Sequence, residues 1–73
     1  MAVGRLGYNS ENGRYGLLVS ELWEDTGFHC GECWEVMVDE KWVKTRMEMS
    51  VEQKWYLVDT PCYGDLEYVQ ARI

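Results

Sequence analysis

The sequence has few basic residues, and this shortage restricts the partners that we expect. Seven Lys and Arg stand against thirteen Asp and Glu, so the formal net charge is −6. Residues 1–36 contain only two bases, Arg5 and Arg14. A protein that binds nucleic acid or an anionic membrane usually presents a basic face, because neutralisation of phosphate supplies much of its affinity. We therefore expect no direct binding of nucleic acid or membrane; the acidic charge either keeps the protein soluble or favours a partner with a basic surface.

Long apolar runs are also missing. The longest aliphatic run is Leu17–Val19, whereas a transmembrane helix needs about 20 apolar residues. Residues 1–9 lack the apolar segment of a secretory signal. The three cysteines are an odd number, unlike the disulfide framework of a small secreted domain. These absences predict a cytoplasmic protein.

The chain is short, with room for one domain, which we assign to residues 1–73. Hydrophobic residues make up 47% of it, including four Trp and five Tyr, and this argues against disorder. A core this small often needs a metal, a covalent staple or a second subunit. The sequence is therefore compatible with a homo-oligomer, and no cofactor is expected.

A single proline and frequent turn residues are typical of short β-strands. Residues 4–8 and 14–19 flank Asn9–Gly13, whose Asn-Gly pair readily adopts positive φ, so we expect a hairpin there. Residues 20–25 form either part of the sheet or one helical turn capped by Ser20. A new strand is expected to start at Phe28.

The best-determined hairpin joins Cys33–Val38 to Trp42–Met49. If Asp39 and Glu40 form a two-residue turn, every facing pair of residues is chemically compatible. A register shifted by one residue would mix bases into the apolar set. The expected pairs are Cys33 with Arg46, Trp34 with Thr45, Glu35 with Lys44, Val36 with Val43, Met37 with Trp42, and Val38 with Lys41.

Trp55–Val58 and Leu66–Ile73 are two further strand-like runs, separated by a loop at Pro61, which cannot donate to a ladder. Five to seven short antiparallel strands must curl to bury one face. We therefore expect an all-β fold, a small antiparallel barrel or roll that is SH3-like. The predicted core residues are Trp34, Val36, Val43, Met47, Trp55 and Leu57.

Cys30 and Cys33 form a Cys-x-x-Cys motif that could ligate zinc or carry out redox chemistry. A closed zinc site needs four ligands, and the remaining candidates are Cys62 and His29, which is too close to Cys30 for both to reach one ion easily. A redox cysteine usually lies at a helix N-terminus, whereas strands and a turn are expected here. We therefore expect structural cysteines beside a tight turn at Gly31 and Glu32, and no bound metal.

The sequence shows no nucleophile–base pair, phosphate-binding loop or Walker lysine, so we do not expect an enzyme. Its aromatic residues favour binding instead, because exposed Trp and Tyr beside Arg are typical of binding hot spots. The first candidate surface is one face of the central hairpin, with Trp42, Lys44 and Arg46, although Trp42 is equally consistent with a packing role. The second is an acidic segment with Glu21, Glu24 and Asp25.

Three runs of the sequence, His29–Val36, Lys41–Glu48 and Trp55–Val58, resemble a small bacterial family classed as a domain of unknown function. Residues 4–6 and 14–17 match as well, so the resemblance covers most of the chain. The family's members are short single-domain proteins of Gram-positive bacteria and their mobile elements. Asp39 and Glu40 stand where the family favours Asn-Gly, and residues 20–27 look longer than is typical. The resemblance implies no site residue, but it favours a phage or mobile-element setting.

We expect a non-enzymatic protein that binds and inhibits a host defence or nucleic-acid-handling protein through an acidic and aromatic surface. One alternative is a small-molecule or nucleotide-binding protein, in which Trp42 and Arg46 stack on the ligand. The other is a zinc-stabilised structural module that uses His29, Cys30, Cys33 and Cys62.

Overall fold

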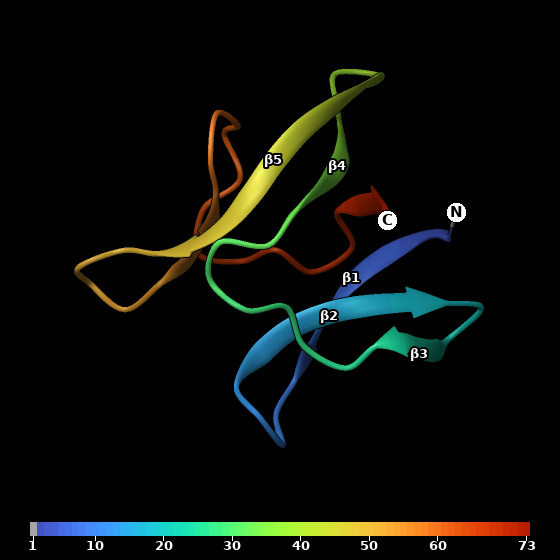
Figure 1. Cartoon of the computed structure of the whole chain (residues 1–73), viewed down its shortest axis with the longest axis horizontal. Helices are drawn as coiled ribbons and strands as arrows, with labels where there is room; N and C mark the ends of the chain where they lie inside the picture. Colours follow the sequence, from blue (N-terminus) through green and yellow to red (C-terminus); the bar gives the residue numbers. More distant parts are fainter. Residues whose placement is uncertain (1) are drawn as a thin grey trace.

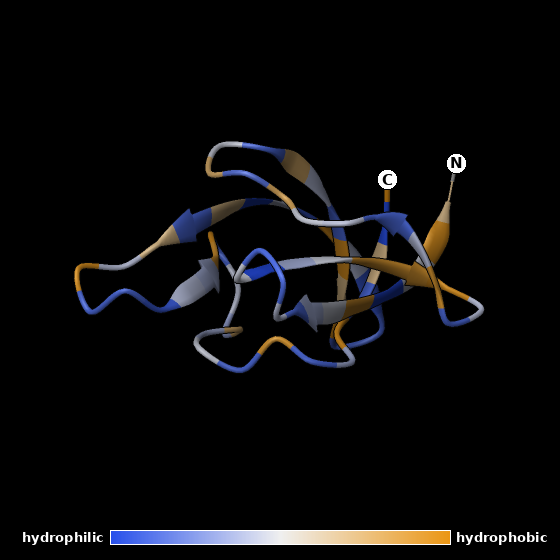
Figure 2. Ribbon diagram, turned by 90° about the horizontal axis from the view of Figure 1, so that it is seen from below, coloured by the Kyte–Doolittle hydropathy of each residue, from blue (hydrophilic) through white to orange (hydrophobic). Residues whose placement is uncertain are grey.

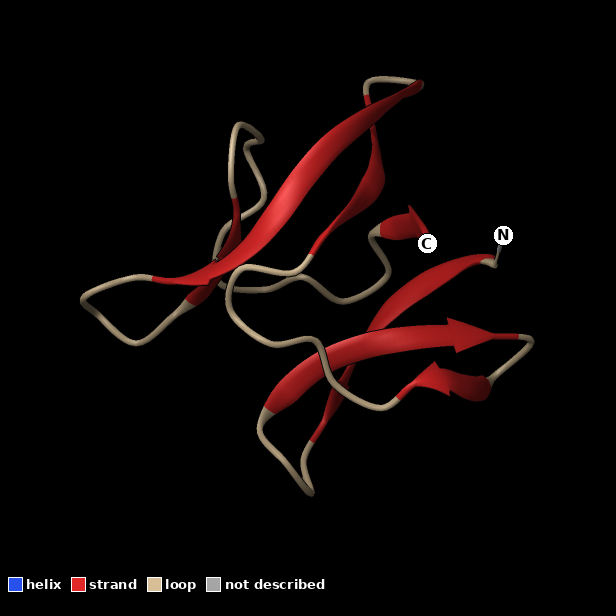
Figure 3. Cartoon of the chain, in the orientation of Figure 1, coloured by secondary structure: helices blue, strands red, loops and turns tan. Residues whose placement is uncertain are grey.

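The computed structural model describes residues 2–73, which form seven β-strands and no helix (Figure 1 and Figure 3). All pairings are antiparallel and join the strands into one sheet, which confirms the predicted all-β fold with five to seven strands. Residues 2–73 accordingly offer no helical segment that could cross a lipid bilayer. The strands are β1 (Val3–Asn9), β2 (Arg14–Val19), β3 (Leu22–Asp25), β4 (Cys33–Val38), β5 (Lys41–Met49), β6 (Trp55–Leu57) and β7 (Gln70–Arg72).

The sheet consists of two three-stranded meanders joined by the last strand. Its order is β3-β2-β1-β7-β4-β5-β6, so β7 lies between β1 and β4 (Figure 1). The two ends of the described chain meet there, because Ala2 and Ile73 exchange backbone hydrogen bonds of 3.0 and 2.9 Å. The two halves of the chain are thus held together by pairing between residues that are far apart in sequence.

The sheet is not closed into a barrel. Within residues 2–73 no pairing joins its end strands β3 and β6, which are only four and three residues long. The outer edge of β6 is instead taken by the 62–64 segment, through a Tyr56–Tyr63 bridge and backbone bonds from Leu57 to Cys62 and from Gly64 to Trp55. A curled, open antiparallel sheet is the observed form.

The first hairpin has the predicted position, with Tyr8 opposite Tyr15 and a turn closed by the Gly13 amide on the Asn9 carbonyl. The helical turn considered for residues 20–25 is wrong. Ser20 and Glu21 have φ of 52° and 64°, and two consecutive positive φ values make a primed hairpin turn rather than a helix. That turn leads directly into β3, which pairs with β2.

The register of the central hairpin is confirmed. All six expected pairs are present between β4 and β5, including Glu35 opposite Lys44. Asp39 and Glu40 have φ of 51° and 66°, so this two-residue turn is primed although it lacks glycine. Chemical compatibility of the facing side chains was therefore sufficient to define the pairing.

Two predicted strand segments are shorter in the structure. Phe28 does not begin a strand: it is followed by a turn over residues 29–32, and β4 starts at Cys33. Only Gln70–Arg72 of the last run is a strand, because Tyr68 has φ of 67° and the Val69 amide closes a turn on the Leu66 carbonyl. In both places a turn positions an apolar residue, Phe28 or Leu66, in the core.

The core lies between the inner faces of the two meanders, and hydrophobic and hydrophilic stretches alternate along the chain accordingly (Figure 2). Four of the six predicted core residues are buried, whereas Val43 and Trp55 are only half-buried. Val43 lies on a part of β5 that β6 does not reach, since β6 pairs only with Met47–Met49. Six further buried hydrophobic residues complete the core: Leu6, Tyr15, Leu17, Phe28, Leu66 and Ala71.

Candidate functional site

The first predicted surface lies on the outer face of β5, the face opposite the core. Trp42, Lys44 and Arg46 alternate there with the inward-facing Val43, Thr45 and Met47. Trp42 is half-buried because the Arg72 guanidinium of β7 stacks over its ring, 4.3 Å from the centroid. Arg72 is in turn held by Glu35, with Nε 2.8 Å from Oε1.

This outer face is therefore more basic than aromatic. One face of the Trp42 ring is occupied by Arg72, while Lys44 and Arg46 are exposed and Arg46 pairs with Glu48 at 2.8 Å. Two shallow hollows of about 430 and 290 Å³ share the side chains of Cys33 and Lys44. Trp42, Lys44 and Arg46 lie together on this face, whereas the second predicted group, Glu21, Glu24 and Asp25, lies at β3 near the other end of the strand order.

The ion pair between Glu35 and Arg72 predicts an acid-sensitive contribution to stability. The pKa of Glu35 lies below its usual value, because the hydrogen bond from Arg72 favours the carboxylate more than burial opposes it. A carboxyl whose pKa is lowered by folding stabilises the native state above its unfolded pKa and loses this contribution as the pH falls through the folded value. We expect the urea midpoint to fall between pH 6 and pH 3, and to fall less in Glu35→Gln. An equal fall in both proteins would contradict this prediction.

The acidic segment is mostly engaged in local contacts. Glu21 accepts hydrogen bonds of 2.6 and 3.3 Å from Arg5, which lower the pKa of its carboxyl. Asp25 accepts from the Gly27 amide at 2.9 Å, and Glu24 is exposed on β3. Glu21 and Asp25 therefore stabilise turns and pairing, and the segment presents Glu24 as its open carboxylate.

The cysteines are not gathered into a metal site in the described residues. Cys30 and Cys33 are exposed, and Cys62 is half-buried against the core. No cluster of three or more potential ligands forms within residues 2–73. The tight turn is present, but it is centred on Cys30 and Gly31 rather than on Gly31 and Glu32: the Glu32 amide donates to the His29 carbonyl at 3.1 Å, and Gly31 has φ of 91°.

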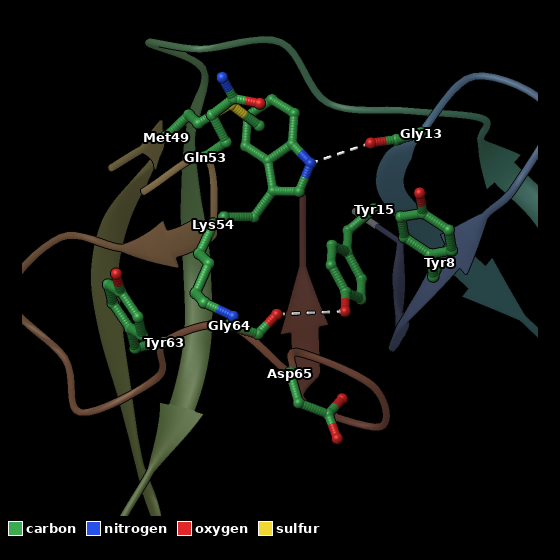
Figure 4. A pocket seen from close by; sticks show the side chains of 10 residues that line it. Tyr8, Gly13, Tyr15, Met49, Gln53, Lys54, Tyr63, Gly64 and Asp65 are labelled. Carbon is green, nitrogen blue, oxygen red and sulfur yellow. Dashed lines mark hydrogen bonds between the residues drawn. The ribbon is translucent and has the colours of Figure 1, made fainter. Parts of the chain in front are cut away.

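A cleft that the sequence did not predict lies between the first hairpin and the β5–β6 hairpin, and it is larger than the two hollows on the outer face of β5. Its volume is about 660 Å³. We call it the aromatic cleft, and Figure 4 shows Tyr63 on one side of it and Tyr8 and Tyr15 on the other. It is lined by four aromatic residues, Tyr8, Tyr15, Trp55 and Tyr63, together with Gly13, Met49, Gln53, Lys54, Gly64 and Asp65.

Hydrogen bonds fix the aromatic side chains in place. The Trp55 indole N–H donates to the Gly13 carbonyl at 2.9 Å, and the Tyr15 hydroxyl donates to the Gly64 carbonyl at 3.3 Å (Figure 4). The Tyr8 ring packs edge-on against Tyr15, with centroids 5.3 Å apart. These bonds cross the cleft, so they set both the distance between its walls and the angles of its rings.

Tyr63 is held by polar contacts at the rim. Its hydroxyl donates to the Glu52 carboxylate at 2.7 Å and lies 3.0 Å from the Ser50 hydroxyl. The contact with Ser50 lowers the pKa of Tyr63, but the Glu52 carboxylate and burial raise it by more, so the net pKa is above the usual tyrosine value. Tyr63 therefore stays a neutral donor to Glu52 at ordinary pH.

The cleft is accessible and its surroundings are acidic. Tyr8 and Tyr63 are both 47% exposed, while Tyr15 is buried at the floor. Lys54 is the one base that lines the cleft, and Asp65 is the acid. Two more carboxylates lie beside the cleft. Glu52 accepts from the Tyr63 hydroxyl, and Glu67 accepts from the Tyr8 amide at 2.5 Å while its other oxygen lies 3.7 Å from the Arg5 guanidinium. The arrangement can hold a flat or extended group against aromatic rings and attract positive charge.

Sequence reasoning missed the cleft because its two walls are about forty to fifty positions apart in the chain. One signal was present: Tyr8 and Tyr15 share the core face of the first hairpin with Leu6 and Leu17, yet they stand at its turn end. Because Tyr8 and Tyr15 face the core side at the turn end of the hairpin, they extend beyond the core and form one wall of the cleft. The opposite wall could not be identified from the sequence.

Two comparisons with known proteins give matches. Residues 4–73 match the family model described as a domain of unknown function, DUF5348. A crystal structure of a protein from Ruminococcus gnavus, a structural genomics target, is 38% identical and superposes with a TM-score of 0.77. That match covers 97% of this chain and 99% of the other. No curated protein matches the chain.

Proposed function

Because this chain belongs to the DUF5348 family of domains of unknown function, we propose a function from its own geometry: it is a non-enzymatic binding protein that contacts a protein partner through the aromatic cleft. The proposal keeps the expectation of an acidic and aromatic binding surface, but it assigns that surface to the cleft instead of to the outer face of β5. The outer face of β5 is the weaker candidate, since Arg72 already covers one face of Trp42.

The observation that carries the proposal is the convergence of four aromatic side chains from two distant segments, two of them half-exposed. Tyr and Trp provide large contact areas with few rotatable bonds, so little conformational entropy is lost on binding. In this cleft the rings are already fixed by hydrogen bonds to Gly13 and Gly64. A preorganised aromatic surface of this kind supports affinity for a partner.

The charge supports a partner with a basic surface. Asp65 lines the cleft beside Lys54, and Glu52 lies at the rim on Tyr63, whereas nearby Glu67 is paired with Arg5. The whole chain carries −6. Complementary charge speeds encounter and disfavours acidic competitors. Association should therefore weaken as salt rises.

We place this partner among host proteins of defence or nucleic-acid handling, in the bacterial cytoplasm, with the gene on a phage or mobile element. The similarity to a protein of Ruminococcus gnavus supports a bacterial setting. An acidic inhibitor that occupies a basic groove would block nucleic acid from that groove, since both present negative charge.

A small molecule is the second candidate occupant, favoured by the volume of the cleft. Its 660 Å³ lies within the range of about 300–1,000 Å³ that is typical of ligand pockets. Native mass spectrometry of protein incubated with metabolite extract separates the two candidates, because a bound metabolite adds a discrete mass.

Loss of the cleft's exposed tyrosines is expected to abolish partner capture. Two truncated hot-spot residues lower affinity by at least about tenfold. We therefore expect Tyr8→Ala with Tyr63→Ala to retain little of the host protein that co-purifies with the wild type. The matched control is Trp42→Ala with Arg46→Ala on the outer face, which should capture normally.

Circular dichroism and thermal melting establish that both double variants are folded. Capture that depends on Trp42 and Arg46, and not on the tyrosines, would show that the outer face of β5 is the site. The proposal would then be wrong about the cleft.

A further inference from the structure

We infer, resting on the proposed function, that the aromatic cleft binds an extended proline-rich protein segment that carries an arginine or lysine. Such a segment adopts the polyproline II conformation, in which the backbone forms no internal hydrogen bonds. Its helix has three residues per turn, so every third side chain points in the same direction. The inference names the chemical class of the partner, and three properties of the cleft support it.

The first property is that the backbone around the cleft is already paired. Addition of a peptide strand requires a free sheet edge, but β1 and β2 pair with each other at Tyr8 and Tyr15. On their other sides the Tyr8 amide donates to Glu67 and the Tyr15 carbonyl accepts from the Phe28 amide. On the opposite wall, β6 pairs with β5 on one side and with the 62–64 segment on the other, where the Gly64 amide donates to the Trp55 carbonyl at 2.8 Å. A partner at the cleft must therefore be recognised through side chains.

The second property is the composition of the lining. A groove for an amphipathic helix is lined by aliphatic side chains, whereas Met49 is the one aliphatic side chain here and the rings of Tyr8, Tyr15, Trp55 and Tyr63 dominate. Proline rings pack well against aromatic faces, and aromatic-lined grooves are the usual sites for polyproline II segments. The Trp55 indole N–H is used by Gly13, so Trp55 offers its ring rather than a donor.

The third property is the placement of donors and of charge. A polyproline II segment exposes carbonyl groups that need donors, and Gln53 and Lys54 line the cleft with exposed donor groups. Asp65 lines the same cleft, and one of its oxygens accepts from the Glu67 amide at 3.1 Å. A basic residue of the segment would pair with this exposed carboxylate. Glu52 adds a second acid at the rim through its contact with Tyr63.

The experiment is a titration of the labelled protein with three synthetic peptides of equal length, followed by nuclear magnetic resonance. The first peptide has prolines at PxxP spacing and one arginine, the second replaces the prolines with alanine, and the third replaces the arginine with glutamate. We expect the first peptide to shift the Trp55 indole and Gly64 amide signals. The second and third should bind at least about tenfold more weakly.

Three variants locate the binding site and the charge. Tyr8→Ala with Tyr63→Ala should abolish the shifts, while Tyr68→Ala, an equally simple truncation of a tyrosine that is 73% exposed outside the cleft, should not. Asp65→Asn keeps an acceptor for the Glu67 amide and removes the charge. It should therefore weaken the arginine peptide about fivefold and strengthen the glutamate peptide, whose carboxylate is no longer repelled.

Equal binding of the alanine peptide, or shifts confined to residues outside the cleft, would overturn the inference. Failure here is distinguishable from failure of the proposed function. If no peptide binds but capture of the host protein still requires Tyr8 and Tyr63, the inference is wrong and the cleft remains the partner surface. If the arginine peptide binds in the cleft but the variant without Tyr8 and Tyr63 still captures the host protein, the ligand class is supported and the proposed partner surface is wrong.

Discussion

Replacing Trp34 by alanine is expected to remove a large part of the protein's stability. Trp34 is 5% exposed, and its ring lies against Phe28 with centroids 4.6 Å apart. Loss of a buried aromatic side chain costs roughly 3–5 kcal/mol, against a total stability of about 4–11 kcal/mol for a domain of this length. Each kcal/mol lowers the melting temperature of so small a domain by about 4–8 °C. Differential scanning calorimetry should therefore show a fall of at least ten degrees or so.

Trp34→Phe is the matched control. The Trp34 indole N–H is buried without a hydrogen-bond partner, and such a donor carries a desolvation cost. Phenylalanine keeps an aromatic ring against Phe28 and removes that donor, so we expect it to cost less than half as much as alanine. An alanine variant that melts within a degree or two of the wild type would show that Trp34 does not support the core.

The second large effect is expected from Gly16→Ala. A Cβ at position 16 would lie 2.1 Å from the Asp25 carbonyl oxygen and 2.9 Å from the Thr26 carbonyl carbon. Both are backbone atoms, so the Asp25–Thr26 segment would have to move away from β2. This segment leads to Phe28, whose amide donates to the Tyr15 carbonyl at 2.8 Å. We expect a loss at or above the top of the ~1–3 kcal/mol range for overpacking, measured by urea unfolding.

Gly7→Ala is the control, because Gly7 lies directly opposite Gly16 on the neighbouring strand. A Cβ there would meet the end of the Leu18 side chain at 2.5 Å, and a side chain can rotate away. We expect this variant to lose only about 1 kcal/mol. Hydrogen exchange should be faster in β3 of Gly16→Ala than in β3 of Gly7→Ala, and equal exchange in the two variants would contradict the account.

The sequence by itself determined the local pairing of neighbouring strands. The register of β4 and β5 followed from the compatibility of facing residues such as Glu35 and Lys44, since a shift of one position turns every side chain to the other face. The first hairpin followed from the Asn-Gly pair before Arg14, and the all-β class from short runs between turn residues. These features depend on residues within about twenty positions of one another, where chain connectivity already limits the alternatives.

Partners that are distant in sequence were decided only by the tertiary structure. The position of β7 between β1 and β4 placed Arg72 over Trp42, so it covered one face of the ring in the predicted surface of Trp42, Lys44 and Arg46. The turns at Phe28 and Leu66 brought two unpredicted residues into the core. Val43 stayed half-buried because β6 is too short to reach it. None of these depends on a local pattern, because strand periodicity shows which face a residue occupies but not which element covers it.

The aromatic cleft shows the same division. The sequence contained its aromatic residues and the acidic charge that surrounds them, and these were enough to favour binding over catalysis as an expectation. The cleft itself exists because two hairpins face each other at one end of the core, where Trp55 bonds to Gly13 and Tyr15 bonds to Gly64 across more than forty positions of chain. Such contacts form only after the sheet has curled, since side chains from different hairpins meet only when both have packed on a shared core.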